Sequence, residues 1–255
     1  MKLMLFIPAY KTEHAIISVL ERIPENIRKK AAEIVVMDNS SPDNLFDRVM
    51  EYKKKKKMAK LKIYRHSKNL LYGGNEKAGC EYAVKHGMDI VVVVHSDGQY
   101  PPEHIAQLIM PIEEEKADTV FGSRISGRGA LRGGMPIWRF SGNILLTFVE
   151  NLITGTRFSE WHSGFRAYSC KALRVLPFKE CVSGYEWTTD IYLLFLANRF
   201  RIAEIPIPTH YGKESTSPSI KTTFLYFCTS TALALNYLLT RFRIRNIHKY
   251  RPVRK

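Results

Sequence analysis

The stretch VVVVHSDGQYPPEHI, residues Val91–Ile105, carries the pattern on which the fold assignment rests. Four consecutive valines are typical of a strand that is buried on both faces of a sheet. They end abruptly in a small polar cluster whose single carboxylate is Asp97. We interpret this abrupt change as a buried strand whose end borders a ligand-binding edge.

Other short apolar runs alternate with helical patterns along the chain, and each of these runs ends in polar or turn-forming residues. Continuous apolar strands separated by helices are typical of a mainly parallel α/β sheet that is covered on both faces. Because ligands bind beyond the carboxyl ends of such strands, the polar residues predict a binding site at that edge. The runs are Leu3–Ile7, Glu33–Ser41, residues 61–67, residues 89–97 and Ala117–Arg124, and the residues that end them include Pro8, Tyr10, Asp38, Asn69, Ser96 and Arg124.

The composition favours a single large domain with an anionic partner. The 255 residues include 39 Lys+Arg against 24 Asp+Glu, a formal net charge of +15. Such an excess suits a nucleic acid, a nucleotide, a phospholipid or a phosphorylated substrate, or it forms a solvated basic surface. We interpret the run Lys53–Lys57 as such a solvated face. The four cysteines have no metal-ligand spacing, which is typical of reduced thiols in a cytosolic protein, and the N-terminal residues do not have the pattern of a signal peptide.

Asp97 is the candidate metal ligand. A carboxylate at a strand end suits a divalent cation that bridges phosphates, because hard cations prefer oxygen ligands. Gln99, two residues later, could supply a second oxygen. The alternative is that Asp97 only caps a helix or forms a turn.

Six segments occur in the order and spacing of family 2 glycosyltransferases, and together they span about residues 1–215. The sequence most resembles the dolichyl-phosphate mannose synthase-like branch, which transfers sugars to polyprenyl phosphates. The resemblance implies a GT-A fold and inversion of configuration at the anomeric carbon of the sugar. The segments are IPAYKTE, VVMDNSSPD, NLLYGGNEKAG, HSDGQYPPEHI, GSR and HSGFRAYS.

The resemblance also implies a nucleotide-sugar site with a divalent cation, Mg²⁺ or Mn²⁺. Asp97 matches the last acid of the family's Asp-x-Asp motif and Gln99 the polar residue after it, so these two are the expected metal ligands. His95 stands where the first acid is usual, and imidazole is a poor ligand for Mg²⁺. The residues expected to bind the nucleotide sugar are Pro8, Tyr10, Glu13, Asp38, Lys77, Ser96 and Asp97.

On the acceptor side, Arg124, Arg139 and Ser141 resemble the contacts that hold the acceptor phosphate. Guanidinium binds phosphate through two parallel hydrogen bonds. A phosphate acceptor is already ionised, whereas a hydroxyl acceptor would need a general base, for which Asp190 is the candidate. The expected catalytic residues are therefore Asp97, Arg124, Arg139 and Asp190.

Two further residues lie in the segment HSGFRAYS. Arg166 could hold a phosphate or support the site through an ion pair, and His162 is interpreted as a structural residue.

The C-terminal part is distinct. Residues 222–240 contain no charge but seven plainly polar side chains, and the tail that follows carries seven Lys/Arg. We expect residues 1–220 to form the GT-A catalytic domain and residues 221–255 to form an amphipathic helix and a basic tail on an anionic membrane surface. Docking on the catalytic core and spanning the bilayer are the alternatives. The expected location is the cytoplasm, peripheral to the inner face of the membrane.

The sequence therefore predicts an inverting glycosyltransferase that moves a sugar from a nucleotide-diphosphate sugar to a polyprenyl phosphate. The first alternative is transfer to a saccharide or lipid hydroxyl with Asp190 as the base. The second is a non-enzymatic basic module that binds nucleotides or nucleic acid. Because the chain lacks interleaved aromatics and a Gly-Lys-Ser phosphate loop, nucleic acid is not an expected partner.

Overall fold

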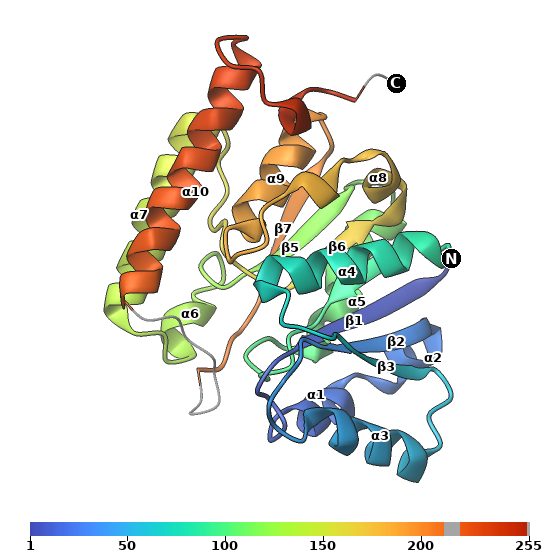
Figure 1. Ribbon diagram of the computed structural model, residues 1–255. Helices are drawn as coiled ribbons and strands as arrows, with labels where there is room; N and C mark the ends of the chain where they lie inside the picture. The colour runs from blue at the N-terminus through green and yellow to red at the C-terminus, as the bar shows by residue number, and fades with distance from the viewer. Residues whose placement is uncertain (212–219, 254–255) are drawn as a thin grey trace.

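A seven-stranded sheet lies at the centre of the molecule (Figure 1). The structure, a computed structural model, describes residues 1–211 and 220–253. The strands lie in the order β3-β2-β1-β4-β6-β5-β7. They are β1 (Leu3–Ala9), β2 (Ala31–Asp38), β3 (Leu61–Arg65), β4 (Ile90–Val93), β5 (Thr119–Ser123), β6 (Arg166–Ser169) and β7 (Ile202–Pro206).

The sheet is mainly parallel, which confirms the predicted α/β class. Strand β6 runs antiparallel to both of its neighbours, β4 and β5, whereas the other pairs of neighbouring strands are parallel. Strand β6 is not among the apolar runs of the sequence, because its four residues are too short a pattern to indicate a strand. The register places Asp38 opposite both Ala9 and Arg65, so the carboxyl ends of β1, β2 and β3 meet at one edge.

Helices cover both faces of the sheet (Figure 1). Helices α1, α3 and α5 share one apolar core with the sheet, and α4, α8 and α9 share the other. The α-helices are α1 (Ile16–Arg22), α2 (Glu25–Lys30), α3 (Leu45–Lys56), α4 (Leu71–Lys85), α5 (Ile105–Glu113), α6 (Gly129–Arg132), α7 (Ile137–Thr154), α8 (Cys170–Val175), α9 (Trp187–Ala197) and α10 (Ile220–Arg241). Three short 3-10 turns are η1 (Pro102–His104), η2 (Phe178–Glu180) and η3 (His248–Tyr250).

The valine run is buried because both faces of β4 are covered. Val92 belongs to one core, whereas Val91 and Val93 belong to the other. Successive strand side chains point to opposite faces, so a strand covered on both sides needs an apolar residue at every position.

The glycine-rich segment after β5 contains the short helix α6. Its glycines allow close packing against the segment that follows β7. A Cβ atom at Gly133 would lie 1.9 Å from the carbonyl oxygen of Thr209, and one at Gly129 would lie 2.2 Å from that of Ile207. The absence of a side chain is therefore needed for contact between two backbones.

Helices α7 and α10 lie side by side at one edge of the molecule and run in the same direction (Figure 1). Their C-terminal ends meet where Arg241 Nη1 donates to the Thr154 carbonyl oxygen at 3.5 Å. Helix α10 also packs against α9, and the chain then returns through η3 to α9. Within residues 1–211 and 220–253, no helix is both long and apolar enough to cross a membrane.

Candidate active site

Asp97 follows the end of β4 and lies next to the end of β1. Thr12 Oγ1 donates to Ser96 Oγ at 2.9 Å and so joins the segments that follow these two strands. The carboxylate of Asp97 accepts the backbone N–H of Gln99 at 3.1 Å. Between them, Gly98 has φ of +72°, which glycine adopts without strain. This tight turn holds the carboxylate of Asp97 and the side chain of Gln99 at the carboxyl edge of the sheet.

The end of β2 carries a second buried carboxylate, Asp38. Its two oxygens accept the backbone N–H of Ser41 at 2.7 Å and Nε of Arg65 at 2.7 Å. The next residue, Asn39, accepts the N–H of Leu70 at 2.8 Å and donates to Asn69 Oδ1 at 3.1 Å. These bonds connect the ends of β2 and β3 with the start of α4. The pocket for a nucleoside that the sequence predicts would therefore have a fixed polar floor.

The segment after β1 forms the rim of this edge. Pro8 is half-buried within β1, and Tyr10 is exposed directly after it. Lys11 has φ of +56°, and its ammonium lies 5.4 Å from the centre of the Tyr10 ring. Glu13 Oε2 accepts the backbone N–H of Asn44 at 2.6 Å. The structure thus groups the predicted residues Pro8, Tyr10 and Glu13 on the same side as Asp38.

His95 forms part of the wall beside Asp97. Its ring packs edge-on against Tyr100, with the ring centres 5.0 Å apart. On another side it meets Gly164, where an added Cβ would lie 2.3 Å from His95 Cε1. Burial lowers the pKa of His95, so the imidazole is neutral near pH 7. A neutral, closely packed imidazole does not replace the charge of the acid that is usual at this position.

A buried carboxyl group, Glu76 on α4, lies behind His95, with its Oε1 4.0 Å from His95 Nε2. Neither of its oxygens has a hydrogen-bond partner among the described residues. Burial raises the pKa of Glu76 to about 8, although the positive charge of Arg166 partly opposes this shift. Glu76 is therefore mostly protonated at neutral pH. The sequence analysis missed this residue, although it lies within the quoted segment NLLYGGNEKAG.

We predict that Glu76 makes the protein less stable as the pH rises. Between about pH 5 and pH 8 the unfolded chain has lost this proton, whereas the folded protein retains it. Because the pKa of Glu76 is higher in the folded protein than in the unfolded chain, its contribution to the free energy of unfolding is largest at low pH. This contribution is lost as the pH rises toward 8. Glu76→Gln, which cannot ionise, should flatten the fall in Tm over this range. Glu81→Gln, an exposed change on the same helix, should keep the wild-type slope. A Glu76→Gln protein with an unchanged slope would contradict this prediction.

Arg124, at the end of β5, is buried in an ion pair with Glu160. Its Nε donates to Glu160 Oε1 at 2.7 Å, its Nη2 also contacts Oε1, and its backbone N–H donates to Oε2 at 2.7 Å. Burial alone would lower the pKa of Arg124, but the Glu160 charge outweighs it and raises this pKa well above its usual value. Conversely, burial would raise the pKa of Glu160, and Arg124 lowers it. The guanidinium fork that was expected to grip a phosphate is thus already occupied by a carboxylate.

Arg139 and Ser141 lie in the first turns of α7. The Arg139 guanidinium lies 5.1 Å from the centre of the Trp138 ring. Burial lowers the pKa of Arg139, and the positive charge of Arg124 lowers it further. The Tyr211 side chain partly opposes these two effects. Arg124 Nη1 also donates to Tyr211 at 3.0 Å, at the edge of the described residues.

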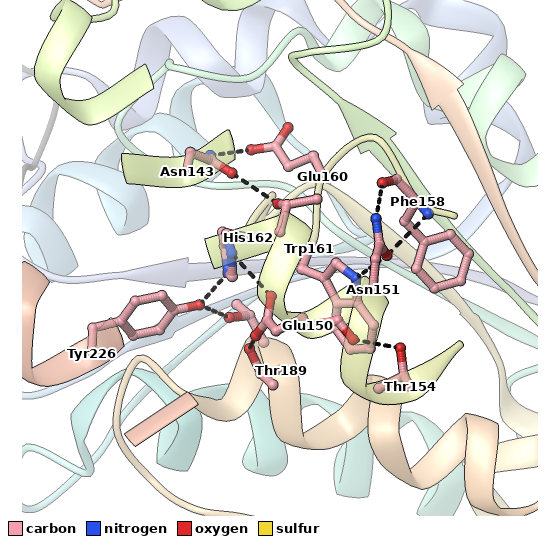
Figure 2. Close-up of polar contacts among 12 residues, drawn as sticks. Asn143, Glu150, Asn151, Thr154, Phe158, Glu160, Trp161, His162, Thr189 and Tyr226 are labelled. Atoms are coloured by element: carbon pink, nitrogen blue, oxygen red, sulfur yellow. Dashed lines mark hydrogen bonds and ion pairs between the residues drawn. The ribbon is translucent and has the colours of Figure 1, made fainter. Parts of the chain in front are cut away.

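A buried polar network connects the loop of Glu160 with three helices (Figure 2). Asn143 on α7 donates to Glu160 Oε1 at 2.8 Å. His162 Nε2 lies 3.2 Å from Glu150 Oε2, and its Nδ1 lies 2.7 Å from the Tyr226 hydroxyl on α10. Thr189 on α9 donates to the other oxygen of Glu150 at 2.8 Å. The network fixes the loop that carries the partner of Arg124, which agrees with a structural role for His162.

Arg166 supports the fold. Its guanidinium is fully buried and donates to the carbonyl oxygens of Ser163, Trp161 and Thr188 at 2.7, 3.0 and 2.9 Å. It also stacks over the Tyr192 ring at 4.0 Å. The sequence left two roles open for Arg166, a phosphate contact or an ion pair. Its hydrogen bonds go to backbone carbonyl oxygens instead.

Lys77 and Asp190 are bonded to other parts of the fold, which differs from their expected places in the nucleotide-sugar and catalytic sites. The ammonium of Lys77 donates to the Cys181 carbonyl oxygen at 2.7 Å and to Ser183 Oγ at 2.9 Å, which fastens α4 to the segment before α9. Asp190 is fully buried, pairs with Lys249 at 2.6 Å and accepts the Tyr250 hydroxyl. In this position Asp190 anchors the C-terminal segment, because Lys249 and Tyr250 both follow α10. Its carboxylate also accepts the backbone N–H of Val182 at 2.9 Å, which ties it to the segment before α9.

The chain matches the sequence profile of the family described as Glycosyl transferase family 2 over residues 4–180. A UDP-N-acetylglucosamine–dolichyl-phosphate N-acetylglucosaminyltransferase from Methanococcus voltae is 30% identical over 221 residues, which are 83% of this chain and 86% of that protein. An undecaprenyl-phosphate mannosyltransferase from Micrococcus luteus is 26% identical, over 81% of this chain and 83% of its own length. These names confirm the predicted resemblance to the polyprenyl-phosphate branch.

Solved structures share the fold. Glucosyl-3-phosphoglycerate synthase from Mycobacterium tuberculosis, in complex with Mn²⁺, UDP and phosphoglyceric acid, superposes with a TM-score of 0.69 and 17% identity, covering 96% of this chain and 80% of that one. The same enzyme with Mg²⁺ and UDP has a TM-score of 0.70 and 18% identity, with the same coverage. The predicted GT-A fold is thereby confirmed. Because the family profile covers well over half of its residues, the chain belongs to glycosyltransferase family 2 and is a glycosyltransferase.

Proposed function

We propose that this glycosyltransferase moves a sugar from a nucleotide-diphosphate sugar to a polyprenyl phosphate with inversion at the anomeric carbon. The observation that carries the proposal is the position of Asp97 at the carboxyl edge of the sheet, together with Arg139 in the first turn of α7 as the candidate phosphate contact. The carboxylate that would serve a hydroxyl acceptor, Asp190, is occupied by Lys249 and Tyr250. The names of the relatives from Methanococcus and Micrococcus support a lipid phosphate as acceptor.

On the donor side, we propose that the nucleoside lies against Asp38, Tyr10 and Glu13, with Pro8 beneath it. The diphosphate would then extend toward Ser96 and Asp97 at the ends of the adjoining strands. Asp38 has a fixed orientation, because Ser41 and Arg65 hold its oxygens. Lys77 would act on this site indirectly, through the α4 position that it secures.

The residues at the end of β4 fit a divalent cation. Asp97 offers a carboxylate and Gln99 an amide oxygen, and both are hard oxygen ligands of the kind that Mg²⁺ and Mn²⁺ bind. The described residues hold no cluster of three or more His, Cys, Asp or Glu that could bind a metal. Asp97 and Gln99 would supply one or two ligands to such a cation, and substrate phosphates and water would supply the others. A cation bound there would neutralise charge on the departing diphosphate.

The acceptor chemistry needs no general base. An ionised phosphate oxygen forms the new bond to the anomeric carbon from the face opposite to the nucleoside diphosphate. The bond from that carbon to the diphosphate oxygen breaks, and its electron pair remains on the diphosphate. The protein must offset repulsion between two anions, and we assign this role to Arg139, with Ser141 two residues later on the same helix. Arg124, neutralised by Glu160, would mainly shape this site.

We predict that Arg139→Ala raises the KM for polyprenyl phosphate and lowers kcat/KM. A lost charged hydrogen bond costs roughly 1.5–3 kcal/mol, which corresponds to about a 10- to 100-fold loss. Arg139→Lys should restore only part of the activity, since lysine supplies the charge without the planar fork. The measurement is steady-state transfer to polyprenyl phosphate at saturating donor. Arg48→Ala, an exposed change on α3, should leave the kinetics unchanged.

The same assay separates the two acceptor classes. Asp190→Asn should lower Tm, because Lys249 loses its buried partner, but it should keep most of its turnover at temperatures where the protein is folded. An inactive, folded Asp190→Asn protein together with normal kinetics for Arg139→Ala would replace the phosphate acceptor with a hydroxyl acceptor.

We also propose that the catalytic domain comprises residues 1–220 and that residues 221–255 associate with the cytoplasmic face of the membrane. The absence of Asp and Glu from residue 220 onward supports attraction to anionic lipid. The described part of this segment also packs on α7 and α9, so membrane contact and docking on the core would involve different sides of α10.

A further inference from the structure

Helix α7 has an unusual distribution of polar and apolar side chains. Its buried side includes Thr147, Glu150 and Thr154, which belong to or adjoin the polar network of Figure 2. Its solvent side carries Phe148 and Leu152, which are 63% and 74% exposed. A surface helix of a globular protein normally buries its apolar stripe and exposes its polar one. Apart from Leu146, which is buried, helix α7 reverses this arrangement, so its own packing in the monomer does not account for the exposed apolar stripe.

The exposed apolar side chains of α7 form one continuous stripe. Ile144, Leu145, Phe148 and Leu152 are spaced so that they lie on the same side of the helix, and Ile137 and Trp138 extend the exposure to its N-terminal end. Contiguous apolar surface of this kind marks an interaction site rather than random exposure.

The neighbouring helix α10 repeats the pattern. Phe224 and Leu225 are exposed in its first turns. Cys228, about one turn after Phe224, and Leu235, about three turns after it, are exposed as well. The opposite side of α10 is buried through Ser230, Ala234 and Tyr237. Since α7 and α10 lie side by side and run in the same direction, we call their solvent-exposed apolar stripes together the outer face (Figure 1).

The exposed charged side chains of α7 and α10 are positive, although the half-buried Glu186 accepts a hydrogen bond from Thr229 of α10 at 2.9 Å. The sequence contains no Asp or Glu between residues 119 and 149, and none from residue 220 to the C-terminus. The one carboxylate of α7, Glu150, is buried. Exposed arginines lie near the C-terminal ends of both helices: Arg157 follows α7, Arg241 ends α10, and Arg243 and Arg245 follow α10. An apolar surface bordered by cations suits an anionic lipid bilayer, in which acyl chains accept the apolar residues and headgroups the arginines.

We propose that the outer face of α7 and α10 lies on an anionic lipid bilayer, with α7 as the principal contact. This proposal rests on the proposed function, because an enzyme whose acceptor is a polyprenyl phosphate has to reach that acceptor at a membrane. It differs from contact through the C-terminal helix alone. It also places Trp138, whose ring is suited to the level of the headgroups, next to Arg139 at the start of α7. The acceptor phosphate would then reach Arg139 while its polyprenyl chain remains in the bilayer.

A second copy of the chain is a less suitable occupant. A symmetric dimer brings the same patch from both subunits together. Here each copy would bring several arginines, and the described residues of the outer face offer no exposed carboxylate to pair with them. An anionic lipid surface supplies the missing negative charge.

Charge substitutions on the outer face provide the test, because removing the C-terminal segment would also take away Lys249 and Tyr250, the partners of Asp190. The variant Leu145→Glu/Phe148→Glu/Leu152→Glu changes only exposed side chains of α7. The control is Met50→Glu on α3, which is 43% exposed and lies at the opposite end of the molecule (Figure 1). Flotation of the full chain with phosphatidylglycerol/phosphatidylcholine vesicles measures binding to an anionic bilayer. Flotation with phosphatidylcholine vesicles measures binding without anionic lipid, and the difference between the two is the contribution of charge.

We expect the wild type and Met50→Glu to float with the anionic vesicles, more weakly when salt is added, since surface attraction is screened over about 8–10 Å at physiological ionic strength. The α7 variant should bind at least about tenfold more weakly, because burying a single Leu or Phe side chain in the bilayer strengthens binding by about tenfold or more. Equal binding by the variant, or no binding by the wild type, would overturn the proposal. So would a wild-type dimer in solution that the substitutions dissociate, without vesicle binding, since the outer face would then join two copies.

Transfer assays separate this proposal from the proposed function. If both hold, the α7 variant keeps normal transfer to polyprenyl phosphate in detergent micelles and loses it on vesicles. Vesicle binding as expected, together with no transfer to polyprenyl phosphate in either setting, would leave the membrane face intact and refute the acceptor.

Discussion

Replacing Asp97 with Asn should abolish sugar transfer while leaving the fold and Tm close to those of the wild type. The amide keeps the shape of the side chain and can still accept the backbone N–H of Gln99 that Asp97 accepts at 3.1 Å. It removes the negative charge that would hold a divalent cation against the donor diphosphate. Since charge neutralisation of this kind is worth several kcal/mol, we expect turnover to fall at least about a hundredfold.

The measurement is transfer of labelled sugar as a function of Mn²⁺ and Mg²⁺ concentration, with Tm recorded for each protein. Asp47→Asn, the same chemical change at an exposed position on α3, should behave like the wild type. Full activity of Asp97→Asn with an unchanged metal requirement would show that Asp97 only forms the turn at the end of β4.

The largest effect on stability should come from Arg124→Ala. The substitution leaves the Glu160 carboxylate fully buried without its counter-charge. Breaking a buried pair from one side typically costs about 3–5 kcal/mol, which lowers Tm by roughly 10 °C in a protein of this size. The measurement is thermal or urea unfolding. Arg201→Ala, which removes an arginine from the exposed pair with Asp118, should change Tm much less.

A double substitution shows whether the missing counter-charge is the cause. Arg124→Ala/Glu160→Gln should be more stable than Arg124→Ala alone, because the amide does not leave a charge in the core. If the double variant is as unstable as the single one, lost packing of the arginine side chain explains the effect. If Arg124→Ala is fully stable and only loses transfer, Arg124 is a direct phosphate contact, as the family resemblance implies.

The main architecture was accessible from the sequence because burial on both faces of the sheet leaves a local signal. The valine run predicted β4, and the polar residues that end each apolar run predicted the carboxyl edge where Asp38 and Asp97 lie. Strand β6 was missed, because four residues within a functional motif give too short a pattern to distinguish a strand from a loop.

The candidate site was less accessible, because its electrostatics depend on residues far apart in the sequence. The partner of Arg124 is 36 residues away, at Glu160, and the partner of Asp190 is 59 residues away, at Lys249. Local pattern shows that a residue is charged and follows a strand, but it does not show which charge faces it. The reversed polarity of α7 was hidden for the same reason. An amphipathic pattern predicts two faces of a helix, and only packing decides which one meets solvent.

Transfer of label into lipid tests the central claim most directly. The full chain is incubated with a panel of radiolabelled nucleotide sugars and Mn²⁺, with polyprenyl phosphate in detergent as one acceptor and the dephosphorylated polyprenol as the matched control. We predict that one labelled sugar enters the organic phase with polyprenyl phosphate and not with polyprenol, and that Asp97→Asn abolishes this transfer. Equal labelling of polyprenol, or labelling only of saccharide acceptors in the aqueous phase, would contradict the phosphate acceptor.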